Sequence, residues 1–170
     1  MNTTMDQRYI DECKQIQQNA TYSAETHHRM AVRDQHRAFW LQVIPACIAA
    51  GSGALVAAGV SPTSLLWLTV LSATVAAVSN ILNPQKSYQD HLSAAKGFTA
   101  LKHDARFLHE AQSSNMTDPE FRLATAYLHE KYNDLVKIVP PTDPKVFEQA
   151  RITIQAGIHE PDRSLRGEIK

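Results

Sequence analysis

The longest uncharged segment of the chain lies between Arg37 and Lys86, where 48 consecutive residues include no Asp, Glu, Lys, Arg or His. All 34 acidic and basic residues of the protein, 17 of each sign, lie outside this segment. A soluble domain places charged side chains on its surface, whereas membrane-spanning sequence excludes them. We therefore expect a membrane protein.

The length of the uncharged segment predicts two membrane spans. A helix needs ~20 residues to cross a hydrocarbon core of about 30 Å, so 48 residues hold two spans and a short turn. Ser61-Pro62-Thr63-Ser64 is the central group of turn-forming residues, and Asn83-Pro84 marks the exit. We expect spans at about 39–60 and 65–82, within a transmembrane hairpin of residues 38–84.

The basic residues predict the orientation of this hairpin. They flank its two outer ends and are absent from the turn. The flanking residues are Arg29, Arg33, Arg37, Lys86, Lys96, Lys102 and Arg106. By the positive-inside rule both termini face the cytoplasm, with Trp40 at the inner interface and Trp67 near the outer one.

The remaining sequence predicts cytoplasmic helices. Residues 6–37 contain neither Pro nor Gly, which favours one helix, within an N-terminal segment of residues 1–37, that runs into the first span. Residues 85–157 should form further helices: one to about residue 110, one from Asp118 to about 139, and one from Pro144 to about 156. Residues 158–170 carry too little apolar surface to order themselves. The expected fold is an all-α membrane protein, a two-helix transmembrane hairpin with long cytoplasmic helical extensions.

The chain contains histidines and cysteines, but not at the spacing that metal binding or catalysis requires. His109-Glu110 and His129-Glu130 lack the second His, four residues after the first, of a zinc-protease helix. The other histidines, His27-His28 and His36 among them, supply no fixed ligand set, and two Cys make no zinc site. We expect no catalytic, metal or cofactor site and, at zero net charge, no nucleic-acid partner.

Both spans carry a stripe of small or polar residues at steps of three and four. In the second span these are Thr69, Ser72, Ala76, Ser79 and Asn83, beside an apolar stripe of Leu68, Leu71, Val75, Val78 and Leu82. In the first span the candidate packing residues are Ala46, Ala49, Gly53 and Ala57, after Gln42. Such stripes either hold the hairpin together or, in a homo-oligomer, line a water-filled path.

Short segments on either side of the spans resemble a known family. They are Arg37-Ala38-Phe39-Trp40, Val60-Ser61-Pro62, Leu82-Asn83-Pro84 and the stretch from His91 to Phe98, followed by Leu101 and Arg106. In order and spacing they are similar to the SLATT family, two-transmembrane effector domains found beside SMODS nucleotide synthases and SLOG nucleotide sensors in bacterial conflict systems. The resemblance covers roughly residues 10–135.

The resemblance implies a pore-forming or membrane-disrupting antiphage effector in the bacterial inner membrane, acting with a nucleotide synthase or sensor and causing cell death. This sequence departs from fused members of the family because the residues after Glu130 are too few for a nucleotide-binding fold. Either the helices therefore sense the trigger themselves, or a separate synthase or sensor protein does. Two alternatives remain: a passive two-span anchor or accessory subunit that docks a cytoplasmic partner, and a holin-like lysis protein.

Overall fold

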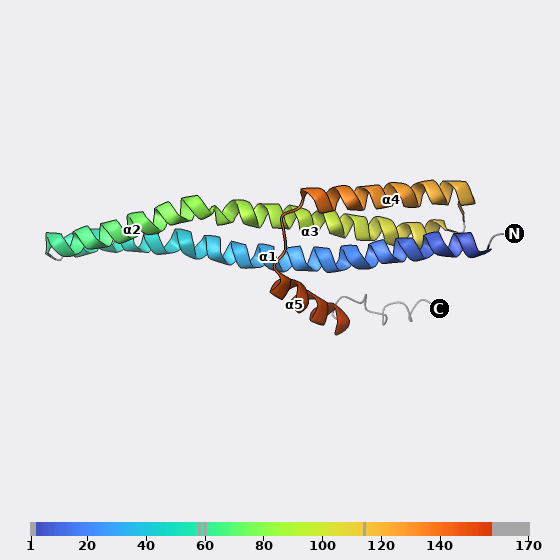
Figure 1. The fold of residues 1–170 in the computed structure, drawn as a ribbon. Coiled ribbons are helices and arrows are strands. Elements are labelled where there is room, and N and C mark those ends of the chain that lie inside the picture. Colours follow the sequence, from blue (N-terminus) through green and yellow to red (C-terminus); the bar gives the residue numbers. More distant parts are fainter. Residues whose placement is uncertain (1–2, 58, 60, 114, 158–170) are drawn as a thin grey trace, which may run out of the picture. The chain divides into compact units, whose positions relative to one another are not determined.

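The computed structural model describes residues 3–57, 59, 61–113 and 115–157, without the side chains of residues 3–6, 53, 56 and 57. Every regular element in this part of the chain is helical (Figure 1). The all-α prediction is confirmed for these residues. The predicted disordered tail, residues 158–170, lies outside the described residues.

Helix α1 (Thr3–Ala57) is continuous through the start of the uncharged segment, as predicted, and contains Pro45. Helix α2 (Pro62–Leu82) begins three residues earlier than the predicted second span. Pro62 is suited to the first helical position because an amide N–H there would have no hydrogen-bond acceptor within the helix. Asn83, the residue after the last of α2, has a left-handed φ of 39°, a conformation that asparagine tolerates better than most residues.

The C-terminal half contains α3 (Pro84–Phe107), the π-helix η1 (Leu108–Gln112), α4 (Asp118–Ile138) and α5 (Pro144–Gln155). A capping box joins Thr117 and Glu120 at the start of α4, and the Asp143 carboxylate accepts a hydrogen bond from the Lys145 amide at the start of α5. Gly157, at φ 78°, follows α5. The predicted start of α5 is confirmed, with Asp143 as its cap, whereas the residue that caps α4 is Thr117 and not the expected Asp118.

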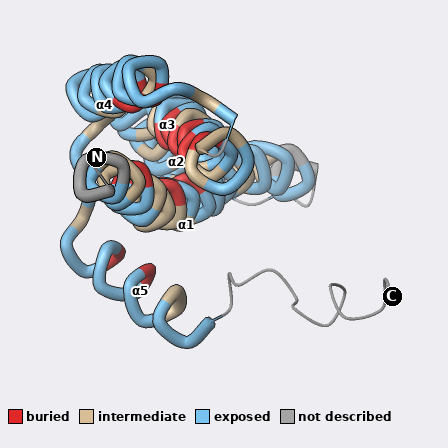
Figure 2. The backbone as a smooth tube through the Cα atoms, turned by 90° about the vertical axis from the view of Figure 1, so that its right-hand side faces the viewer, coloured by how far each residue is buried: buried red, intermediate tan, exposed pale blue. Residues whose placement is uncertain are grey.

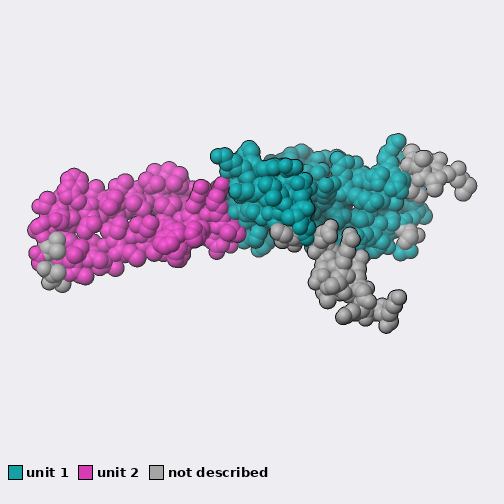
Figure 3. Space-filling view, turned by 90° about the horizontal axis from the view of Figure 1, so that it is seen from below, with its two compact units in different colours: residues 1–30, 91–170 teal, residues 31–90 magenta. Residues whose placement is uncertain are grey.

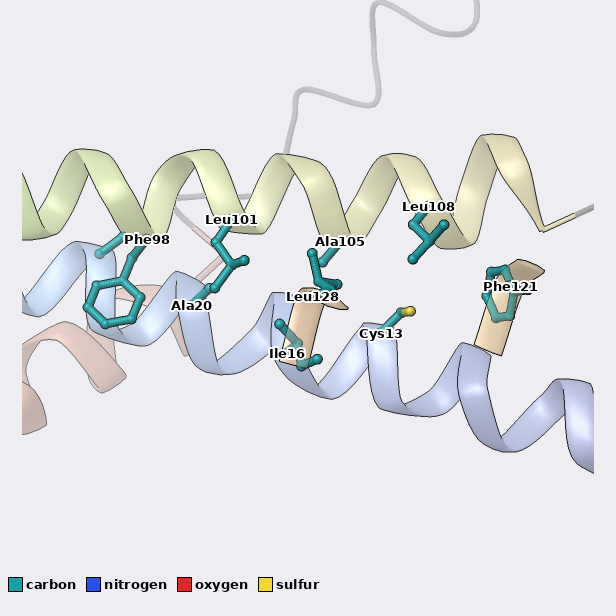
Figure 4. Close-up of a cluster of buried hydrophobic side chains, with 10 residues drawn as sticks. Cys13, Ile16, Ala20, Phe98, Leu101, Ala105, Leu108, Phe121 and Leu128 are labelled. Atoms are coloured by element: carbon teal, nitrogen blue, oxygen red, sulfur yellow. The ribbon is translucent and has the colours of Figure 1, made fainter. Parts of the chain in front are cut away.

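The chain divides into two compact units, coloured separately in Figure 3. Unit 1 comprises residues 1–30 and 91–170, and its core lies where α1, α3 and α4 meet (Figures 2 and 4). Large core side chains come from all three helices. They are Ile16, Phe98, Leu101, Leu108, Phe121 and Leu128. Apolar residues at steps of three and four bury one stripe of each helix against the other two.

Helix α5 packs against α1 within unit 1. The rings of Tyr22 and Phe147 lie 6.3 Å apart, and the Arg29 guanidinium donates a hydrogen bond of 2.7 Å to the Thr153 hydroxyl. Val146 and Ala150 are the buried residues of α5.

Unit 2, residues 31–90, is an antiparallel helix pair built from the C-terminal half of α1 and from α2, with the first residues of α3. Ser72 contacts Pro45 and Ser87 contacts Asp34, so position along one helix rises as position along the other falls. Among the described residues, one helical stretch, within Pro62–Gln112, is long and apolar enough to cross a membrane, and its most apolar part is unburied. This composition indicates membrane association.

Candidate functional site

The two helices of unit 2 meet along one face of each, marked by half-buried residues at steps of three and four. On α2 these residues are Leu65, Leu68, Ser72, Val75 and Ser79, and on α1 they are Leu41, Pro45, Ile48 and Ser52. The Ser72 hydroxyl donates a hydrogen bond of 3.3 Å to the Pro45 carbonyl. We call these residues the hairpin contact face.

The contact face divides the polar stripe predicted on the second span. Ser72 and Ser79 lie on it, whereas Thr69, Ala76 and Asn83 are exposed. The contact face also takes Leu68 and Val75 from the apolar stripe, so it combines members of both predicted stripes. Residues three apart on a helix differ by only about 60° in direction, which places Ser72 and Val75 on the same side.

The predicted packing residues of the first span lie beside the contact face of α1. Ala46 and Ala49 are both exposed and take no part in the hairpin contact. Gly53 and Ala57 belong to α1, but their side-chain surroundings lie outside the described part of the structure. The two described alanines are therefore available for contacts beyond the hairpin.

Exposed small and polar residues follow the same side of both helices. On α2 they are Thr69, Ala73, Ala76 and Asn80, and on α1 they are Gln42, Ala46 and Ala49. On both helices, each of these residues comes directly after a residue of the contact face. Each set is therefore turned from its contact face by about 100° around the helix axis, in the same direction. Because the helices are antiparallel, equal rotation brings both sets to one side of the pair. We call this the small flank.

The opposite side of the pair carries large apolar side chains. They are Ile44, Leu55, Leu71, Val78 and Leu82, and all of them are exposed. Burial of such side chains gains roughly 1.5–3 kcal/mol each, so a surface of this kind requires a lipid or protein cover. The hairpin therefore has a bulky apolar side and a small, partly polar side.

A buried carboxylate links α1 to the start of α3 within unit 2, at residues just outside the uncharged segment. Asp34 is 6% exposed and accepts a hydrogen bond from the Ser87 hydroxyl, while Arg33 and Arg37 lie 3.9 and 3.5 Å from its Oδ1. We did not predict this contact from the sequence. The sequence does contain a signal for it: Asp34 and Ser87 lie nearly the same number of residues from the connection between α1 and α2. Two antiparallel helices place such residues beside each other.

Unit 1 contains a buried pair of histidines, which we also did not predict. His27 Nδ1 and His91 Nδ1 are 2.9 Å apart, so one ring donates a hydrogen bond and the other accepts it. The His27 ring also stacks on Phe98, with centroids 5.7 Å apart. Burial, followed by the charge of His91, lowers the pKa of His27 from 6.5 to about 4. His27 is therefore neutral at physiological pH.

The other reactive side chain of unit 1 is buried as well. The Cys13 sulfur lies 3.5 Å from the Thr125 hydroxyl oxygen, and burial raises the pKa of its thiol. A thiol of this kind stays protonated and unreactive. No cluster of three or more His, Cys, Asp or Glu suited to a metal ion occurs among the residues described.

The chain matches no family model, no curated protein and no solved structure.

Proposed function

We propose that the protein is a membrane effector of a bacterial antiphage system. Its hairpin inserts in the inner membrane and self-associates, and on a signal from a separate nucleotide-linked synthase or sensor it opens or disrupts the bilayer. The observation that carries this proposal is the 48-residue uncharged segment, in which helix α2 has no buried residue. Exposure of so large an apolar surface to water is unfavourable, whereas the lipid chains of a bilayer cover it.

The same segment supports a topology of two spans with both termini in the cytoplasm. The basic residues at its two ends favour the cytoplasmic side, and the connection between the helices carries no charge. Trp40 fits the inner interface, where its indole N–H donates a hydrogen bond of 3.1 Å to His36. An indole ring with a polar partner at the end of an apolar helix is typical of a membrane boundary.

The two-sided hairpin supports the self-association step. Its bulky apolar side suits lipid, and its small flank allows close approach of a second hairpin because Ala46, Ala49 and Ala76 offer little steric hindrance. In a ring of hairpins, Thr69 and Asn80 on the same flank would provide polar groups beside water. A path of uncharged groups should pass ions with little charge selectivity.

The substitutions Ala76→Leu and Val78→Leu test this proposal. Both residues are exposed, but Ala76 lies on the small flank and Val78 on the bulky apolar side of the pair. We expect wild type and Val78→Leu to make cells leak a small dye on overexpression, whereas Ala76→Leu, at matched membrane abundance, loses the leakage. Equal leakage from the two variants would show that the small flank is needed neither for contact between hairpins nor for the path.

The main alternative function is a passive two-span anchor that docks a soluble partner. The exposed apolar residues Leu123 and Tyr127 on α4 favour a docking role for unit 1. An anchor predicts no leakage from wild-type protein at any expression level, whereas an effector predicts leakage when the protein is overexpressed, and more when its trigger is also present.

A further inference from the structure

Unit 1 has an open groove between α1 and α3, with a volume of about 650 Å³. Its floor is apolar and includes Ala24, Leu92 and Ala95. Basic side chains lie along its α3 side, the exposed Lys96 and the half-buried Lys102. Neither lysine forms an ion pair with any described residue. Glu25, the acidic residue of the groove, is bound by Arg29 at 2.6 Å.

Helix α4 presents the complementary surface. Leu123 and Tyr127 are 75% and 67% exposed, and Glu120 and Glu130 lie beside them. Hydrogen bonds from Thr117 lower the pKa of Glu120, so this carboxylate stays ionised. Neither glutamate is paired with a cation among the described residues. We call these four residues the α4 outer face.

The two surfaces match in length and in charge. Leu92 to His103 along the groove is about 16 Å, and Glu120 to Glu130 along α4 is about 15 Å, at the helical rise per residue. The unpaired charges are positive in the groove and negative on α4. Both surfaces also offer an apolar centre, as the buried part of a specific interface does.

The two surfaces lie on opposite flanks of the α1–α3 pair. Gly97 of α3 faces α4, since a Cβ placed there would lie 3.1 Å from Leu135 Cδ2. Lys131 of α4 also bridges to Asp104 of α3, at 2.7 Å. The groove lies along the other side of α3. One copy cannot place its own α4 outer face in its own groove, but a neighbouring copy can.

We propose that the groove binds the α4 outer face of a second copy of this chain. The contact is head-to-tail, because each copy offers one surface of each kind. Repeated contacts of this type form a ring where the rotation between neighbours closes and an open filament where it does not. The inference rests on the proposed function, in which hairpins held in one membrane assemble around a path. Unit 1 then sets the order of neighbours, and the small flank forms the contact within the bilayer.

Charge reversal tests the contact in full-length protein. We expect Lys96→Glu and Glu130→Lys each to weaken association at least about tenfold, since each places like charges together. The double variant should associate as wild type does, and an equal mixture of the two single variants should also assemble. Lys145→Glu, on the exposed start of α5, is the matched control and should have no effect. Light scattering in micelles and cross-linking in vesicles measure the assembly, and circular dichroism checks folding.

The outcomes separate this inference from the proposed function. A monomeric wild type, unchanged assembly in both single variants, or no restoration in the double variant would each overturn the head-to-tail contact. Loss with Lys96→Glu that Glu130→Lys does not restore would assign the groove to another ligand, such as an anionic lipid or an acidic protein. Restored assembly without any dye leakage would support the contact and contradict the pore.

Discussion

The buried pair of His27 and His91 should make unit 1 sensitive to mild acid. The folded protein holds the pKa of His27 at about 4, whereas an unfolded chain returns it to 6.5. Between these two values the unfolded chain binds a proton that the folded chain does not. The folded state is therefore fully stable, in this respect, above pH 6.5, and loses stability as the pH falls from 6.5 towards 4.

The size of the effect follows from the two pKa values. Their difference corresponds to at most ~3 kcal/mol, at about 1.4 kcal/mol for each pKa unit. Linkage places about 2 kcal/mol of this loss between pH 7.5 and pH 5. His27 is 2% exposed, so solvent screening does not reduce the figure much. A loss of this size is a large part of the stability of a small helical unit.

Urea unfolding in detergent micelles at pH 7.5 and pH 5 measures this loss. We expect wild type to lose about 2 kcal/mol more than His27→Gln, which cannot be protonated at that position. His103→Gln removes an exposed histidine and should keep the wild-type pH dependence. The reasoning fails if His27→Gln and wild type lose the same stability between the two pH values.

Two further predictions address the core and the topology. Phe98→Ala should lower the free energy of unfolding by ~3–5 kcal/mol because Phe98 is only 1% exposed. Phe107 is 58% exposed, so Phe107→Ala should change the free energy of unfolding by less than ~0.5 kcal/mol. The midpoints of urea unfolding compare the two variants. In a background without the native cysteines, Ser61→Cys should react with an impermeant maleimide from the periplasm, and Asn115→Cys should not. The reverse labelling pattern would contradict cytoplasmic termini.

The sequence by itself determined the helices and most of their ends. Local chemistry controls these features: Pro144 opens α5 and Asp143 caps it, as predicted. Pro62 is the exception, because the sequence placed it in a turn whereas it opens α2. The absence of charge from one segment similarly separates the apolar hairpin from its polar extensions, because charged side chains are costly in lipid and their exclusion can be seen in composition. None of these inferences requires knowledge of what lies across from a residue.

Only the tertiary structure decided which side of each helix faces another helix. Small, polar and apolar residues recur at the same steps on α2, so periodicity could not show that Ser72 faces Pro45 while Thr69 stays exposed. The contacts of His27 with His91 and of Asp34 with Ser87 depend likewise on the register of an antiparallel pair. Register is set by contacts between side chains that lie dozens of residues apart in the sequence. When a helix carries several similar stripes, a single sequence does not show which of them packs best against the partner helix.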